Sequence, residues 1–236
     1  MTFNVNIKFL SGQFYLHYFF GQMLQLMNKE FKVKVCGMKY PQNIETVSEL
    51  NPDMMGFIFH PNSPRYVERL DAKVVHSIPD SILKIGVFVD QKFVDTYLMI
   101  EKYKLNGVQL HGNEPVEYCK SFKELNLTVL KAFPISRAAD FDATIPYEGA
   151  CDYFVFDTKT SLPGGSGVKF DWNILYEYQG NTPFLLSGGI SPEDVESIKK
   201  INHPKFSGVD INSKFEISPG LKSLVMVGAF VHKLIG

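Results

Sequence analysis

The sequence predicts a single-domain (β/α)8 barrel of the α/β class, a TIM barrel, with a short N-terminal extension. Short β-branched and aromatic runs alternate with segments of helical spacing, which is typical of βαβ units and a parallel sheet. Eight such runs fit within one chain of 236 residues, and this favours a closed barrel over an open sheet. The runs cover residues 32–36, 53–59, 83–89, 106–110, 128–131, 151–157, 182–187 and 206–211.

Residues 1–30 are predicted to lie outside the domain, and residues 31–236 are predicted to form the barrel. The run from Phe9 to Leu26 is aromatic-rich, but its glutamines and histidine make it too polar for a membrane helix. It also lacks the small-residue cleavage site of a secretory signal. No low-complexity linker divides the remaining chain, so we expect one domain, with Met27 as its working start.

Composition and charge indicate an ordinary globular protein. Hydrophobic residues make up 45% and charged residues 21%, which is enough apolar material for a buried core. The formal net charge of -1 predicts no broad attraction to nucleic acid or to an anionic membrane. Three irregularly spaced cysteines argue against a disulfide framework and favour a reducing, cytoplasmic location. No CxxC or HExxH motif occurs, so no metal is expected.

The first run ends at a cysteine. Strand alternation places Lys34 and Cys36 on one face and Val33 and Val35 on the other, and the valines should face the surrounding helices. Lys34 and Cys36 are therefore expected inside the barrel, where a nearby ammonium favours the thiolate. Cys36 is a candidate base or nucleophile, and the alternative is a small buried hydrophobic residue. Cys119 and Cys151 favour that second interpretation.

Carboxylates close several later runs. Asp157 follows an apolar stretch at the end of the sixth run, where its protonated form is favoured and it can act as an acid. The alternative is a helix cap or a loop contact. Asp90 and Asp210 also end runs. Asp53 begins one, on the face that serves stability in a barrel, so a structural role is expected.

Three glycine- or amide-rich segments can bind an anion on backbone N–H groups. Two of them follow the seventh and eighth runs, where barrels often hold phosphate at a helix N-terminus. Each motif alone can be a tight turn, but together they predict a phosphate site. The candidate residues are Gly165, Ser166 and Gly167 in the first segment, Ser187, Gly188 and Gly189 in the second, and Asn212 and Ser213 in the third.

Other candidates lie in the loops after the second and fourth runs. Arg65 follows Ser63-Pro64, and its planar fork suits a carboxylate, although an exposed surface charge is the simpler interpretation. Gln109 and His111 surround the end of the fourth run. His111 can shuttle protons, but a hydrogen-bonded structural histidine is favoured.

Together these residues resemble the phosphoribosylanthranilate isomerase family of tryptophan biosynthesis. The resemblance runs from Lys32 to the C-terminus and rests on an ordered series of motifs rather than on any one of them. The motifs are Lys34–Gly37, Gly56–Phe59, Ser63–Arg65, Gly86–Asp90, Val108–Gly112, Phe156-Asp157, Gly164–Gly167, Ser187–Gly189 and Gly208–Asp210 continuing to Glu216.

The resemblance implies a single-domain barrel without cofactor or metal. It implies an Amadori rearrangement of N-(5-phosphoribosyl)anthranilate, an aldose–ketose isomerisation that forms the third step from chorismate to tryptophan. Cys36 then matches the general base, Asp157 the general acid and Arg65 the residue that holds the anthranilate carboxylate. The glycine-rich loops and the Ser213 region match the phosphate site, with Lys34, Gln109, His111 and Asp210 in support. The expected partner is this small phosphosugar, and the chain is expected to be a monomer or homodimer.

One departure concerns the segment after the eighth run, where the family often has Gly-Val and this chain has Lys214-Phe215. Lys214 is expected either to add a phosphate contact or to face solvent.

Three rival functions fit less well. The histidine-pathway sugar isomerase performs the same rearrangement but has an aspartate at the position of Cys36. Indole-glycerol-phosphate synthase uses lysine and glutamate at strand ends, and this chain lacks a convincing set of those. A non-catalytic phosphosugar-binding barrel needs the phosphate loops but no acid–base pair, so it does not account for both Cys36 and Asp157.

Overall fold

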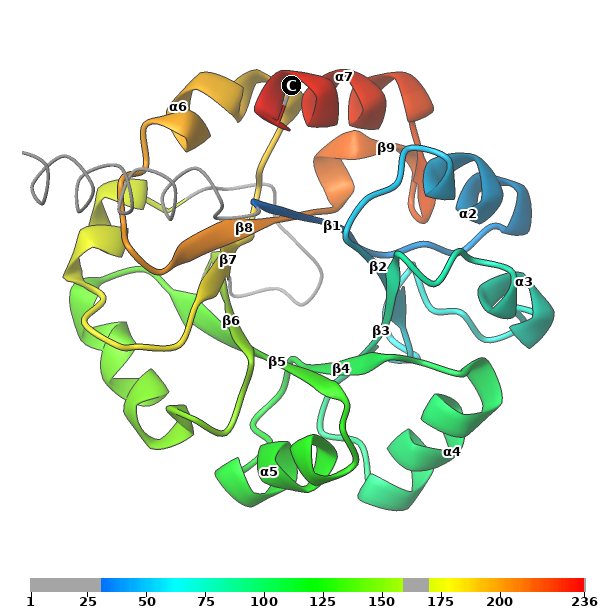
Figure 1. Cartoon of the computed structure of the whole chain (residues 1–236), viewed down its shortest axis with the longest axis horizontal. Helices are drawn as coiled ribbons and strands as arrows, with labels where there is room; N and C mark the ends of the chain where they lie inside the picture. The colour runs from blue at the N-terminus through cyan, green and yellow to red at the C-terminus, as the bar shows by residue number, and fades with distance from the viewer. Residues whose placement is uncertain (1–30, 159–169, 236) are drawn as a thin grey trace, which may run out of the picture. The chain divides into compact units, whose positions relative to one another are not determined.

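The computed structural model describes residues 31–158 and 170–235, and it forms a closed barrel of eight parallel strands in sequential order (Figure 1). All eight predicted runs become strands, so the predicted fold class is confirmed. The strands are β1 (Lys32–Val35), β2 (Met54–Ile58), β3 (Leu83–Phe88), β4 (Gly107–Leu110), β5 (Thr128–Ile135), β6 (Tyr153–Thr158), β7 (Phe184–Leu186) and β8 (Phe206–Ile211).

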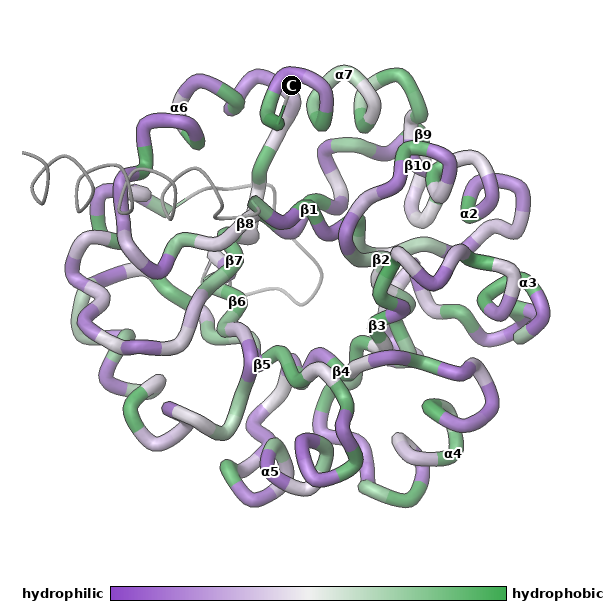
Figure 2. Tube along the Cα trace, viewed as in Figure 1, coloured by the Kyte–Doolittle hydropathy of each residue, from purple (hydrophilic) through white to green (hydrophobic). Residues whose placement is uncertain are grey.

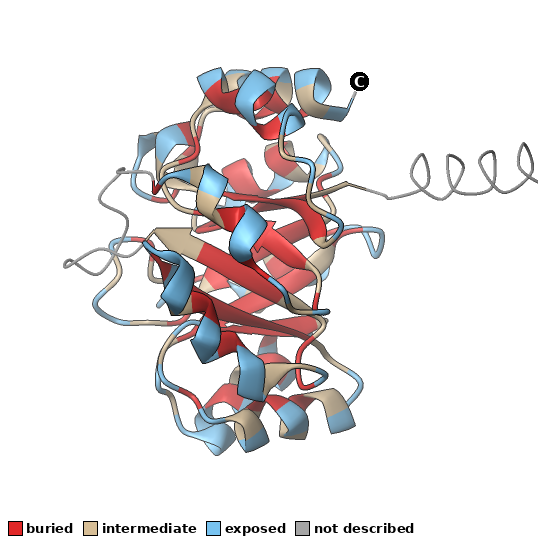
Figure 3. Cartoon of the chain, turned by 90° about the vertical axis from the view of Figure 1, so that its left-hand side faces the viewer, coloured by how far each residue is buried: buried red, intermediate tan, exposed pale blue. Residues whose placement is uncertain are grey.

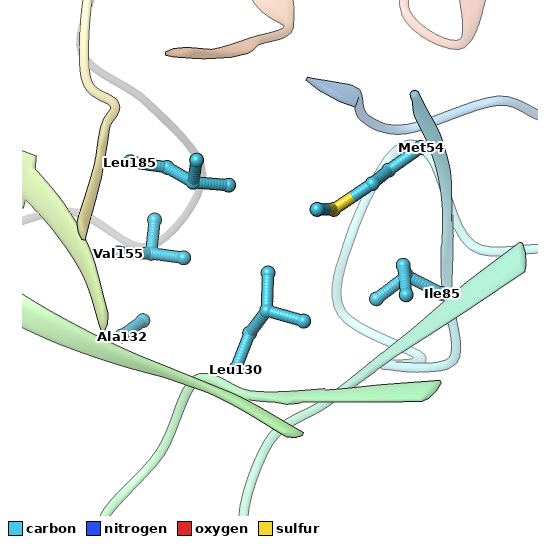
Figure 4. Close-up of a cluster of buried hydrophobic side chains, with 6 residues drawn as sticks. All are labelled: Met54, Ile85, Leu130, Ala132, Val155 and Leu185. Carbon is cyan, nitrogen blue, oxygen red and sulfur yellow. The ribbon is translucent and has the colours of Figure 1, made fainter. Parts of the chain in front are cut away.

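The barrel interior is packed with side chains from alternate strand positions. A layer of branched and apolar residues fills its centre, so the barrel is a core and not a pore (Figure 4). Strand β1 closes the ring by pairing with both β2 and β8. The layer consists of Met54, Ile85, Leu130, Ala132, Val155 and Leu185.

Helices surround the strands, with hydrophobic and hydrophilic residues alternating along them (Figure 2) and their outer faces exposed (Figure 3). The connections after β5 and β6 contain 3-10 helices rather than α-helices. The helices are α2 (Pro41–Ser48), α3 (Ala72–His76), α4 (Phe93–Tyr103), α5 (Val116–Glu124), η1 (Ala138–Tyr147), η2 (Trp172–Glu177), η3 (Pro192–Asp194), α6 (Val195–Lys199), η4 (Ser213–Phe215) and α7 (Leu224–Ile235).

The end of the barrel where the strands begin is held by structural carboxylates. Asp53 accepts hydrogen bonds from the Val33 backbone N–H at 2.8 Å and from Lys32 Nζ at 3.0 Å. Asp53 thereby fixes the start of β1 against β2, as expected for a residue on the face that serves stability.

One element was missed by the sequence analysis. Strands β9 (Glu216–Ser218) and β10 (Leu221–Lys222) form a small antiparallel hairpin after β8. Its turn contains Pro219-Gly220, and Gly220 has a positive φ of 85°, the arrangement that suits a type II turn. The Pro-Gly dipeptide is therefore a sequence signal for this turn, although it does not predict the strand pairing on either side.

Among the described residues, no helix is long and apolar enough to cross a membrane. The same part of the chain contains no group of three or more His, Cys, Asp or Glu side chains placed to hold a metal ion. Residues Lys32–Gly236 form one compact unit, whereas the predicted extension at residues 1–30 lies outside the described residues.

A shortened chain beginning at Met27 is expected to fold as the full chain does, because the first barrel strand begins only at Lys32. Thermal unfolding followed by circular dichroism checks this. A shortened chain that aggregates or melts well below the full chain would show that the extension belongs to the folded domain.

Candidate active site

A buried ion pair lies beside Cys36 at the end of β1. Lys34 and Asp210 are direct partners in the pairing of β1 with β8, and Lys34 Nζ lies 2.9 Å from Asp210 Oδ2. The Lys34 side chain is fully buried and that of Asp210 is 4% exposed. Cys36 follows β1, and its backbone N–H donates to the Ile211 carbonyl at 2.9 Å, which continues the pairing. The predicted alternation thus places Lys34 and Cys36 inside the barrel.

Gly56 on β2 makes room for this group. A Cβ atom at Gly56 would lie 2.8 Å from Cys36 Sγ and 3.1 Å from Lys34 Nζ. The first contact is closer than real Cβ atoms approach, so any larger residue there would displace the thiol.

The charges near Cys36 have opposing effects on its thiol. Burial raises the pKa of Cys36, and the Lys34 and Lys222 ammonium groups partly offset that rise. Burial alone would lower the pKa of Lys34, but Asp210 and Cys36 raise it above its usual value, so Lys34 stays charged. A cation fixed beside the thiol is what stabilises a thiolate in a water-poor site.

A second group lies at the ends of β4 and β6. His111 Nε2 lies 3.5 Å from Asp157 Oδ2, and Gln109 Nε2 lies 3.0 Å from His111 Nδ1. Asp157 Oδ1 accepts a hydrogen bond from the Thr158 backbone N–H at 2.8 Å. The side chains of His111 and Asp157 are 37% and 29% exposed, so both can reach a bound molecule. β7 and β8 separate Asp157 from Cys36 around the ring.

The predicted phosphate residues fall in two described loops and one segment that is not described. Gly188 and Gly189 follow β7 with positive φ angles of 84° and 68°. A Cβ atom at Gly188 would clash with Thr158 and Asp157, so glycine lets this loop approach the end of β6. Ser187 is buried and its backbone N–H donates to the Phe156 carbonyl at 2.8 Å. The predictions for Gly165, Ser166 and Gly167 lie outside the described residues.

The loop after β8 continues the same end of the barrel. Asn212 follows β8, and Ser213 begins η4. Lys214 is exposed to solvent, which agrees with one of the two alternatives for it. Phe215 is fully buried, and its ring lies 4.9 Å from that of Phe230 on α7. Phe215 therefore anchors η4 to α7, and Lys214 takes no part in that contact.

Arg65 is buried and paired, not a surface charge. Its Nε donates to Glu216 Oε1 at 2.9 Å and its Nη2 donates to Glu216 Oε2 at 2.7 Å. Lys222 Nζ donates to Glu216 Oε1 at 2.6 Å and to Asn212 Oδ1 at 2.7 Å. Glu216 and Lys222 were not predicted as site residues. The hairpin that contains both was itself missed. Glu216 entered the sequence analysis only as the end of the last family motif, and Lys222 did not enter it.

The described site places the thiol that follows β1 beside the ammonium of Lys34, and the carboxyl group of Asp157 on β6 beside the imidazole that follows β4. It adds a guanidinium from the loop after β2. These groups suit proton transfer on an anionic substrate. The family model of N-(5′-phosphoribosyl)anthranilate isomerase matches residues 33–233. The chain belongs to this family.

Relatives and solved structures agree with membership in the phosphoribosylanthranilate isomerase family. An N-(5′-phosphoribosyl)anthranilate isomerase of Parabacteroides distasonis is 46% identical over 205 residues, which are 86% of this chain and 93% of that protein. The phosphoribosylanthranilate isomerase structure from Thermotoga maritima matches with a TM-score of 0.78 and 32% identity, covering 86% of this chain and 98% of that one.

A third match is a phosphoribosylanthranilate isomerase in complex with reduced 1-(o-carboxyphenylamino)-1-deoxyribulose 5-phosphate. Its TM-score is 0.75 with 29% identity, and it covers 86% of this chain and 98% of that chain. The resemblance found in the sequence is therefore confirmed.

Proposed function

We propose that this chain isomerises N-(5′-phosphoribosyl)anthranilate to 1-(2-carboxyphenylamino)-1-deoxyribulose 5-phosphate, with Cys36 as general base and Asp157 as general acid. Membership in the isomerase family supports the reaction. One observation supports the two roles. Cys36 lies beside Lys34, Asp157 lies beside His111, and both pairs lie where strands of the same closed parallel barrel end. In such barrels that end holds the active site.

The proton transfers balance over the reaction. Protonated Asp157 donates to the furanose ring oxygen, the C1′–O bond breaks, and a Schiff base forms between C1′ and the anthranilate nitrogen. The Schiff base acidifies the C2′ proton, which the Cys36 thiolate accepts. The resulting enolamine tautomerises to the ketone. The enzyme is left with a thiol and a carboxylate, and exchange with solvent restores the starting protonation states.

The substrate's two anionic groups have separate binding sites in this proposal. Arg65 binds the anthranilate carboxylate through its guanidinium fork. The loops after β6, β7 and β8 hold the phosphate, with Gly165, Ser166, Gly167, Ser187, Gly188, Gly189, Asn212 and Ser213 as the proposed residues. The positive φ angles of Gly188 and Gly189 support this, because such backbone turns direct N–H groups towards an anion.

The direct test is the fluorescence decay of freshly prepared phosphoribosylanthranilate after addition of the purified protein. Rapid loss of the signal is expected, above the spontaneous decay of the substrate. Folded protein that leaves the decay unchanged would contradict the proposal. The histidine-pathway aminoaldose phosphate and a phosphosugar binding assay would then separate the rival isomerase from a non-catalytic barrel.

Arg65→Ala is expected to raise KM by at least about tenfold with a smaller change in kcat, because it removes charge-assisted hydrogen bonds to a substrate group remote from the reacting carbons. Steady-state kinetics measure both. Arg69→Ala is the matched control: its side chain is 91% exposed and pairs only loosely, at 3.7 Å, with Glu68. Equal KM values for Arg65→Ala and the unmodified protein would show that Arg65 does not bind the substrate carboxylate.

A further inference from the structure

The hairpin formed by β9 and β10 brings two buried charged groups to Arg65. Glu216 lies at the start of β9 and Lys222 at the end of β10, and their side chains are 4% and 0% exposed. A two-stranded hairpin on a barrel loop does not need a fully buried lysine for stability, since burial of a charge is costly unless it is well paired. Glu216 and Lys222 are closely paired, so the cluster that they form with Arg65 has a defined geometry, which can serve a function.

Glu216 determines which edge of Arg65 remains available. It binds the guanidinium through Nε and one N–H of Nη2. A guanidinium has five N–H donors in a fixed plane, so Nη1 and the second N–H of Nη2 form a further edge that can bind another carboxylate through two hydrogen bonds. No hydrogen bond from Arg65 Nη1 is found within the described residues. Glu216 therefore holds the plane of Arg65 while it leaves this edge open.

Lys222 determines the charge of the cluster. Arg65 and Glu216 alone would be a neutral pair, with little attraction for a second carboxylate. The Lys222 ammonium, 2.6 Å from Glu216 Oε1, balances that carboxylate and leaves one net positive charge among the three groups. The other nearby ion pair, Lys34 with Asp210, is itself neutral. One positive charge matches one substrate carboxylate.

We propose that Glu216 and Lys222 are positioning residues for substrate recognition: Glu216 orients the Arg65 guanidinium, and Lys222 neutralises Glu216, so that Arg65 can select a substrate with a carboxylate on its aromatic ring. This inference deepens the proposed function and rests on the proposed role of Arg65. It assigns the β9–β10 hairpin as the element that creates specificity for an anionic aromatic ring.

The test compares two ligands that differ only in the carboxylate. One is reduced 1-(o-carboxyphenylamino)-1-deoxyribulose 5-phosphate, and the other is the same compound with an unsubstituted phenyl ring. The carboxylate preference is the ratio of their Kd values, measured by calorimetry at pH 7 in the Cys36→Ser protein, where thiol titration cannot contribute. Any effect on phosphate binding through Asn212 appears in both Kd values and cancels in the ratio.

Lys222→Met is expected to lower the carboxylate preference by at least about tenfold, because a charge-assisted, two-point interaction loses the net charge that supports it. Glu216 remains paired with Arg65 in this variant, so no charge is left buried alone. The double variant Lys222→Met with Glu216→Gln restores one net positive charge, and it is expected to regain most of the preference. A structural defect at Lys222 would not be repaired by a second substitution.

Two results would overturn the proposal. One is an unchanged preference in Lys222→Met. The other is a lost preference that the double variant does not regain. Arg65→Ala in the same assay separates this inference from the proposed function. If the unmodified protein is an active isomerase but Arg65→Ala keeps the carboxylate preference, Arg65 does not recognise the carboxylate. Glu216 and Lys222 then have no role in that recognition either. An inactive, folded protein contradicts the proposed function itself.

If Lys222→Met does not fold, the carboxylate preference measured as a function of pH still tests the role of Lys222. Burial lowers the pKa of Lys222 to about 8, although Glu216 and Cys36 act in the opposite direction. Above that pH, Lys222 loses its proton and the cluster becomes neutral. The other groups near Lys222 do not change their protonation state in this pH range. Burial alone would raise the pKa of Glu216, but Arg65 and Lys222 hold it below its usual value, so Glu216 stays charged. Asn43 and Asn212 do not titrate.

The Cys36→Ser protein is therefore expected to lose carboxylate preference as the pH rises from about 6 to about 9.5. The range starts this low because Cys36, which raises the pKa of Lys222, is absent from this protein. Lys34 has a raised pKa and stays paired with Asp210, so it does not account for such a loss. A preference that is constant across this range would contradict the role of Lys222.

Discussion

Cys36→Ala is expected to lower kcat by at least about a hundredfold, the usual contribution of a positioned proton transfer. The variant removes the only thiol beside Lys34 in the described site, and the carboxylate that remains there, Asp210, is already paired with Lys34 at 2.9 Å. Alanine fills most of the same buried volume and folding should change little. Single-turnover fluorescence decay of phosphoribosylanthranilate measures the loss, with thermal unfolding as the check on folding.

Cys119→Ala is the matched control for Cys36→Ala, because Cys119 is also buried but lies on α5, outside the proposed site. Its kcat is expected to stay within about twofold of the unmodified protein. Cys36→Ser should be as slow as Cys36→Ala, since a serine hydroxyl does not ionise near neutral pH. Turnover close to that of the unmodified protein in Cys36→Ala would remove this residue from the mechanism.

Asp157→Asn should also reduce kcat by at least about a hundredfold, because the amide keeps the shape of the side chain but has no acidic proton to give to the ring oxygen. The amide oxygen of the variant can still accept the hydrogen bond that the Thr158 backbone N–H makes to Asp157, so the end of β6 should keep its structure. The same fluorescence assay measures the effect, and the KM should change much less than kcat.

Asp152→Asn is the control for Asp157→Asn. Asp152 precedes β6 at the opposite end of the barrel, where it accepts hydrogen bonds from the Val129 backbone N–H at 2.8 Å and from Lys123 Nζ at 2.9 Å. Its substitution can lower stability, but kcat for the folded protein should be unchanged. If both variants lose activity equally, the effect of Asp157→Asn is a consequence of stability and not of proton donation.

The eight strands were predictable because their signal is local. Apolar, β-branched runs of a few residues identify a buried parallel strand without any long-range information. The same periodicity of two placed Lys34 and Cys36 inside the barrel. The strand boundaries were predicted less accurately. β5 continues to Ile135, beyond the predicted residue 131, because its pairing with β6 extends along that neighbouring strand. The 3-10 helices after β5 and β6 likewise depend on how each connection packs.

The environment of Arg65 was not predictable, and the interpretation of an arbitrary arginine as a surface charge was wrong here. Arg65 and Glu216 are 151 positions apart in the chain. Their contact exists because closure of the barrel brings the loop after β2 close to the hairpin after β8, across β1. No local pattern in either segment carries that information.

The barrel, the family and the strand ends near which Cys36 and Asp157 lie were therefore all predictable from the order of residues, because parallel strands of one sheet bring their last residues to the same end. The surroundings of those residues, in contrast, depend on the folded barrel. In the folded barrel, Lys34 pairs with Asp210, and Arg65 pairs with Glu216. Lys222 is buried beside Arg65 and Glu216. Charges interact through space over a few ångströms, and the separation between such groups is fixed by strand register and barrel closure rather than by their order in the chain.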